Sequence, residues 1–116
     1  MAPGIVERFQ EIDRVSDRRF VLGLQAATAN LYWRLATGTQ RRIFAMNEND
    51  RFRIWLHYVI SEGREDVATT IRELAKPVVA IAPGETSGSL FVDQANVETI
   101  LSVIDSVVAA VGQMKG

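Results

Sequence analysis

Apolar residues recur at helical spacing along most of this chain, which predicts a protein built from amphipathic helices. The last such segment has the widest apolar face, formed by Val97, Ile100, Leu101, Ile104, Val107, Val108 and Val111. The polar residues between them fall on the opposite side, so we expect a helix over 93–113 that packs its apolar face against a partner. Because β-branched residues lower intrinsic helix propensity, this helix must gain its stability from packing.

The same periodicity predicts four more helices, over 3–15, 17–37, 50–62 and 65–76. Pro3 suits a first helical turn, while Gly63 and Pro77 stand where the third and fourth of these helices should end. The sequence leaves open whether residues 3–37 form one helix or two.

These segments favour an all-α fold, a bundle of four to five helices over a single domain of residues 1–116, closed by a long connection over 77–92. An alternative stays open within that connection. The apolar run at 78–82 and the segment Leu90–Val92 flank a Gly- and Ser-rich stretch, which would suit a small hairpin at 78–92 and an α+β fold.

Composition narrows the classes of protein. With 116 residues, 47% hydrophobic and 23% charged, the chain has the make-up of a folded globular domain. It contains no cysteine, which excludes disulfides and thiolate metal sites. We find no apolar run that suits a membrane span or a signal peptide, so we expect a cytoplasmic location and no membrane partner.

Catalytic and metal-binding signatures are missing from the sequence. His57 is the single histidine, and no carboxylate shares its face of the expected helix. The segment Gly84–Ser89 has the composition of a phosphate-binding loop but lacks the spacing and the lysine of a P-loop. We therefore expect no catalytic residue, no metal and no cofactor, and an enzyme or small-ligand binder around His57 is the weakest hypothesis.

The leading hypothesis rests on surplus apolar surface. On the expected helix 50–62, Ile54 and Tyr58 form a second apolar stripe, and Val103 lies beside the main stripe of the last helix. We therefore predict a non-enzymatic protein-interaction module (an assembly factor, adaptor or chaperone) that binds a protein partner or associates as a homo-oligomer.

An alternative function comes from charge. The net charge is −1, but the stretch 34–53 is locally basic and rich in aromatic residues, with arginines at Arg34, Arg41, Arg42, Arg51 and Arg53. Arginine binds phosphate and aromatic rings stack on bases, so this stretch predicts a nucleic-acid-binding accessory protein. The acidic pI of about 5.8 weighs against that alternative.

Overall fold

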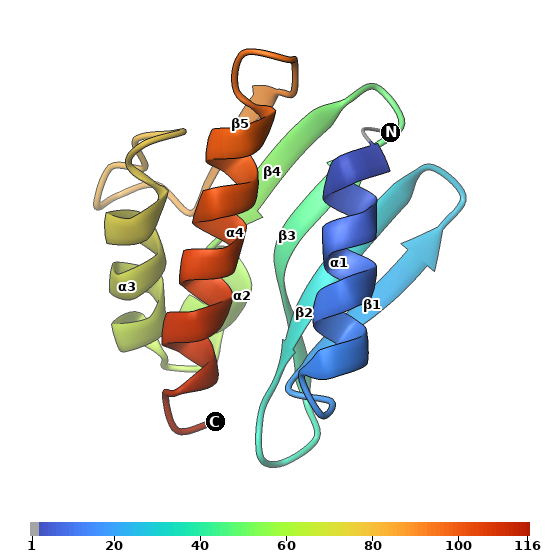
Figure 1. Cartoon of the computed structure of the whole chain (residues 1–116). Helices are drawn as coiled ribbons and strands as arrows, with labels where there is room; N and C mark the ends of the chain where they lie inside the picture. The colour runs from blue at the N-terminus through green and yellow to red at the C-terminus, as the bar shows by residue number, and fades with distance from the viewer. Residues whose placement is uncertain (1–2) are drawn as a thin grey trace.

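A computed structural model describes residues 3–116 and shows four helices and five strands (Figure 1). In chain order these are α1 (Pro3–Val15), β1 (Phe20–Gln25), β2 (Thr28–Arg34), β3 (Gln40–Asn47), β4 (Arg51–Trp55), α2 (His57–Ser61), α3 (Glu65–Ala75), β5 (Ser87–Phe91) and α4 (Val97–Gly112).

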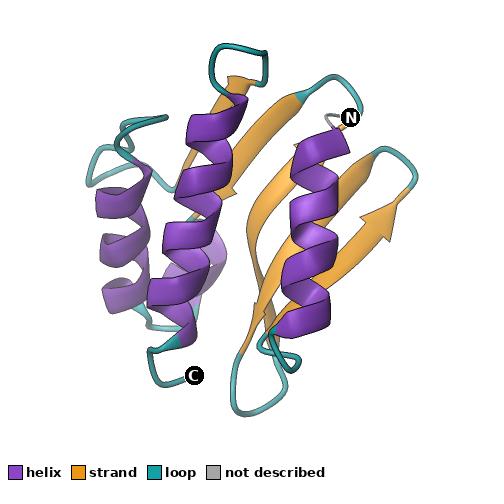
Figure 2. Ribbon diagram, viewed as in Figure 1, coloured by secondary structure: helices purple, strands orange, loops and turns teal. Residues whose placement is uncertain are grey.

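The strands form one antiparallel sheet in the order β1-β2-β3-β4-β5, so each strand pairs with its neighbours in sequence. Only the step from β4 to β5 is long, because α2 and α3 lie between them. Figure 2 shows α1, α3 and α4 on one side of the sheet, with α3 beside α4. The protein therefore has two layers, a helical one and a β one.

The expected all-α bundle is wrong, because the sequence 17–37 forms no helix. It folds into the hairpin β1-β2, in which Gln25 pairs with Thr28 and only Ala26 and Ala27 form the turn. Apolar residues alternate on both strands, as at Phe20 and Leu22, but they also fit a helical spacing. Because two alanines carry no turn signal and favour helix, the local sequence concealed the hairpin.

The expected helix 50–62 is also wrong over its first half. Phe52 and Ile54 alternate on β4, and only the segment His57–Ser61 is helical. The preceding stretch, which lies between two of the expected helices, is the strand β3. The turn between these strands consists of Glu48, Asn49 and Asp50, and Asp50 has a positive φ of 61°.

Three expected helices are confirmed in place: α1 over 3–15, α3 within 65–76 and α4 within 93–113. Gly63 has the predicted left-handed φ of 76°. The alternative α+β fold is partly right. The segment 78–82 forms no strand, but β5 lies within the proposed hairpin range and pairs with β4.

The core lies between the sheet and the helices. Phe9 of α1 stacks on Phe44 of β3, with ring centroids 6.3 Å apart, and Phe44 contacts Phe52 of β4 at 5.5 Å. On β2, Ala29, Leu31 and Trp33 face the helices and are at most 1% exposed. Trp33, Phe44 and Phe52 all point toward the helices, so the alternate positions on these strands face the other side of the sheet.

Candidate functional site

The side of the sheet opposite α1 and α4 carries the candidate site, which we call the open face. Alternation along the strands and the pairing between them place these residues on it: Gly23, Thr28, Asn30, Tyr32, Arg34, Arg42, Ala45, Asn47, Arg51, Arg53, Trp55, Ser89 and Phe91. Most are half-buried or exposed, whereas most of their neighbours on the helical side are buried.

Every charged residue within the five strands is an arginine. None of the fourteen acidic residues of the chain lies in a strand. Four of the five arginines that the sequence singled out, Arg34, Arg42, Arg51 and Arg53, belong to the open face. The charge of the chain is therefore divided between its two sides, even though the net charge is only −1.

Arg41 is the exception among these five arginines. It pairs with Trp33 across the hairpin, on the helical side, because a bulge between Leu31 and Tyr32 resets the alternation of β3. Its Nε donates to Oε1 of Glu62 at 2.6 Å. The structure thus separates Arg41 from the other four arginines.

Aromatic rings, instead of carboxylates, contact three of the four open-face guanidinium groups. Arg51 lies over the ring of Phe91 at 4.7 Å, and Arg53 lies over the ring of Trp55 at 4.9 Å. Arg42 lies 5.9 Å from the ring of Tyr32 and 5.5 Å from that of Tyr58, which α2 contributes at the edge of the face. Within residues 3–116, no ion pair involves an open-face arginine.

A hollow of about 190 Å³ lies on the open face, which we call the arginine hollow. Its lining consists of Thr28, Arg42, Ala45, Asn47, Arg51, Arg53 and Trp55. Three side chains at or beside it have buried polar atoms without a hydrogen-bond partner in the described chain: Nε of Arg42, Nε1 of Trp55, and both amide atoms of Asn30. The hollow therefore combines positive charge, aromatic rings and buried polar atoms that lack a hydrogen-bond partner.

No family model matches this chain, and no curated protein or solved structure matches it. Its function must be argued from the open face itself.

Two kinds of feature are absent within residues 3–116. These residues contain no cluster of three or more His, Asp or Glu side chains that suits a metal ion. None of the helices described there has the length and apolarity needed to cross a membrane. The cytoplasmic location stays a prediction.

The three residues proposed for protein interaction lie in two different surroundings. Ile54 is 0% exposed and Val103 is 3% exposed, both in the core between sheet and helices. The second stripe assumed a helix over 50–62, whereas Ile54 lies on a strand and Tyr58 on α2. Of the three, only Tyr58 reaches the open face, where it contacts Trp55 at 5.8 Å between ring centroids.

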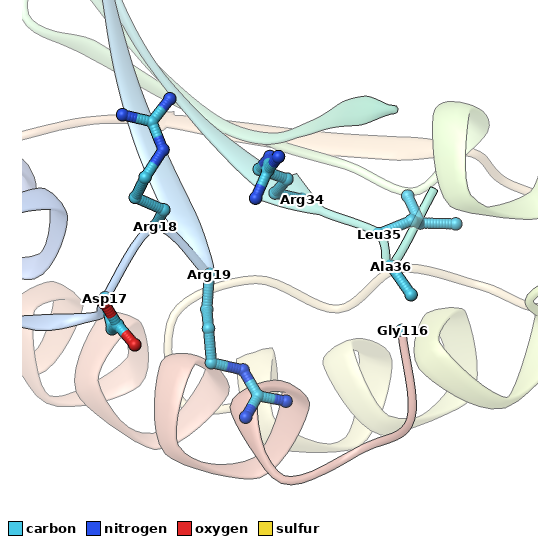
Figure 3. A pocket seen from close by; sticks show the side chains of 7 residues that line it. All are labelled: Asp17, Arg18, Arg19, Arg34, Leu35, Ala36 and Gly116. Carbon is cyan, nitrogen blue, oxygen red and sulfur yellow. The ribbon is translucent and has the colours of Figure 1, made fainter. Parts of the chain in front are cut away.

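A second hollow, of about 310 Å³, lies at the other end of β2 and includes Arg18, Arg19 and Arg34 (Figure 3). Their guanidinium groups point in different directions in Figure 3. Arg19 reaches the carbonyl of Met114 at 3.5 Å. Because the three groups do not converge, this hollow shows no single anion position.

The resolved pKa shifts belong to surface ion pairs outside the open face. The hydrogen bond from Arg14 holds the pKa of Glu11 below its ordinary value, and the one from Arg64 does the same for Asp66. His57, the one histidine, packs edge-on against Tyr58 with ring centroids 5.2 Å apart.

Sequence reasoning missed Asn30 and Phe91 as members of the site. A buried asparagine carries no signal of its own in a sequence read as helical, and Phe91 lay in the 77–92 connection, where the hairpin was only the alternative. Strand alternation within 28–34 places Asn30 beside Tyr32 on one face, but that pattern emerges only once the hairpin is known.

Proposed function

We propose that this protein is a non-catalytic module that binds single-stranded nucleic acid on the open face of its sheet. The observation that carries this proposal is the set of arginines Arg42, Arg51 and Arg53, which lie on aromatic rings instead of on carboxylates. Guanidinium groups neutralise phosphates and flat rings stack on bases, so this combination matches both parts of a nucleotide.

The acidic pI does not oppose this proposal, because no acidic residue lies in a strand of the sheet. Eight of the acidic residues lie in α1, α3 and α4, on the far side of the sheet. Glu48 and Asp50 lie in the β3–β4 turn at one end of the open face, and both already have partners. A local cationic face attracts a polyanion even where the whole chain is slightly acidic.

Single strands suit this face better than a duplex. The rings of Trp55, Tyr58 and Phe91 can stack only on bases that are free of a partner strand. Each arginine now bound to a ring can turn toward a phosphate, and the ring it leaves is then free for a base. A duplex of the same sequence offers phosphates but no free base faces, so we expect it to bind more weakly.

The first test measures binding of a fluorescein-labelled single-stranded DNA of mixed sequence by fluorescence anisotropy. For single strands the logarithm of the association constant falls by about 0.7 per neutralised phosphate per logarithm unit of salt. We expect a slope of about −2 to −3 for the open-face arginines over about 50 to 200 mM salt. The double variant Arg42→Ala, Arg53→Ala should bind about tenfold more weakly or worse, with a shallower slope.

Arg41→Ala is the matched control, because it removes the same charge from the same strand but from the helical side. It should leave affinity and salt slope unchanged. No binding at low salt, or equal losses in the control and in the double variant, would overturn the proposal.

Tryptophan fluorescence gives an independent measure of stacking. The chain has two tryptophans, and Trp33 is only 1% exposed in the core, so Trp33→Phe leaves Trp55 as the single reporter. Stacking of a base on Trp55 should quench this emission. Binding that leaves the emission unchanged would contradict a role for Trp55 in stacking.

A second candidate function is self-association, favoured by a separate observation. The exposed large hydrophobics Leu24 and Phe91, 62% and 57% exposed, lie in β1 and β5, the two edge strands of the sheet. Light scattering after size exclusion would give a multiple of 12.9 kDa if these edges join copies. Phe91→Ser and Leu24→Ser should then return the chain to a monomer, and a monomeric wild type would remove this candidate.

A further inference from the structure

The polar atoms of Asn30 are the least satisfied in the open face. Asn30 is 0% exposed, and neither Oδ1 nor Nδ2 has a hydrogen-bond partner within residues 3–116. Burial of an amide without partners is strongly unfavourable, and native proteins rarely keep such groups. The fold itself does not explain why the Asn30 amide is buried without partners beside the arginine hollow.

The residues beside Asn30 on the two neighbouring strands are small. Across the strands it pairs with Gly23 of β1 and Ala45 of β3, and Ala45 lines the arginine hollow. A Cβ at Gly23 would lie 2.8 Å from Cε2 of Tyr32, so the Tyr32 ring lies across Gly23, next to Asn30. Movement of this half-buried ring would open a path from the hollow to the amide.

We propose that the Asn30 amide, together with Arg42 and Trp55, reads the edge of an adenine base bound in the arginine hollow. This inference rests on the proposed function and names the base that the same face recognises. An asparagine amide forms two parallel hydrogen bonds with adenine, accepting from the amino group and donating to a ring nitrogen.

The unsatisfied groups at the hollow are mostly donors, which selects among the bases. Nδ2 of Asn30, Nε of Arg42 and Nε1 of Trp55 donate, while Oδ1 of Asn30 is the one acceptor. Adenine matches this set because it offers one amino group as donor and several ring nitrogens as acceptors. The arginines Arg51 and Arg53 then lie within the same hollow for the adjoining phosphates.

The test compares the 116-residue chain and its Asn30→Leu variant with fluorescein-labelled dA, dC, dG and dT homo-oligonucleotides of equal length. Wild type should bind the dA strand about tenfold more tightly than the dT strand, the scale of one bidentate base contact. Asn30→Leu should lose this ratio while its affinity for the dT strand and its salt slope stay unchanged. AMP at increasing concentration distinguishes a free nucleotide from a base within a strand, because it competes strongly only if the mononucleotide suffices.

Equal wild-type affinity for the four strands would overturn the adenine inference and leave the proposed function standing. Absence of binding to any strand would overturn both. If Asn30→Leu fails to fold, a ¹H–¹⁵N spectrum of the wild type keeps the test decisive. The side-chain amide signals of Asn30 should shift with dA and not with dT, and unchanged signals at saturating dA would overturn the inference.

Discussion

Oδ2 of Asp13 accepts a hydrogen bond of 2.7 Å from the backbone N–H of Leu22. Leu22 lies on β1, an edge strand, at a position where the N–H points away from β2. Three residues after Asp13, the hydroxyl of Ser16 accepts a hydrogen bond from the backbone N–H of Phe20 and donates one to the Phe20 carbonyl, both at 3.1 Å. The end of α1 and the turn after it thus occupy the outer edge of β1 at Phe20 and Leu22, which protects that part of the edge from pairing with another chain.

Asp13→Ala should therefore weaken this edge. The N–H of Leu22 loses its partner, and we expect the free energy of unfolding to fall by about 1–2 kcal/mol. Urea denaturation followed by circular dichroism measures this change. Asp13→Asn keeps a carbonyl oxygen at the same place and should retain most of the stability, so equal losses in the two variants would show that the acceptor is unimportant.

The helices were predictable and the strands were not, for a reason visible in particular residues. Phe9 and Ile12 on α1, and Ile71 on α3, repeat with helical spacing and have no competing period. Phe20, Leu22 and Leu24 alternate, but Phe20 and Leu24 also fit a helix, and Ala26 and Ala27 give no turn signal. The local pattern was ambiguous, and the pairing of β2 with β3 decided it.

The same limit applies to the candidate site. Composition singled out the stretch 34–53 as basic and aromatic, yet the sequence could not tell which of Arg41 and Arg42 faces the helices. Consecutive strand residues point to opposite faces, and the bulge at Leu31 and Tyr32 decides that Arg42, not Arg41, belongs to the open face. Ile54 and Tyr58 were grouped because they are four residues apart, which matters only in a helix.

Ile54→Glu should prevent folding, whereas Tyr58→Glu should leave the protein folded. Ile54 is 0% exposed, so a glutamate there buries a charge without a partner, at a cost comparable with a whole-domain stability of about 5–15 kcal/mol. We expect loss of the folded circular dichroism spectrum for Ile54→Glu and its retention for Tyr58→Glu. A folded Ile54→Glu protein would contradict the placement of this side chain in the core.

Stability should also depend on pH through Asp66. Arg64 donates to both carboxylate oxygens of Asp66, at 3.0 and 2.9 Å, and this holds the pKa of Asp66 below its ordinary value of 3.8. A group whose pKa is lower in the folded state stabilises the fold above its unfolded pKa. That contribution is lost as pH falls through the folded pKa.

Asp66→Asn should consequently flatten the acid side of the stability profile, measured as urea midpoints from neutral pH down to below the pKa of Asp66. Arg64 also lies over the ring of Trp33 at 5.0 Å, a contact that the substitution leaves in place. Glu73→Gln, which removes a partner of the exposed Lys76 on the same helix, is the matched control. An unchanged profile for Asp66→Asn would mean that this pair contributes nothing to folding.

Asn30 and Asn47 provide a final comparison, because both lie on the open face and they differ in whether their side-chain amides have hydrogen-bond partners. Oδ1 of Asn47 accepts from the N–H groups of Asn49 and Arg51, both at 3.0 Å, whereas neither amide atom of Asn30 has a partner in the described chain. Leucine has nearly the shape of asparagine, so the substitution mainly removes polar atoms. Asn30→Leu should raise the unfolding free energy by about 1–3 kcal/mol, and Asn47→Leu should lower it.

Thermal unfolding of the two variants measures both changes in stability, the expected gain and the expected loss, in one experiment. A gain in Asn30→Leu together with loss of adenine preference would mean that the chain keeps an unfavourable amide for binding. A loss similar to that of Asn47→Leu would mean that the Asn30 amide is satisfied in solution, which would remove the physical reason for assigning it to a ligand.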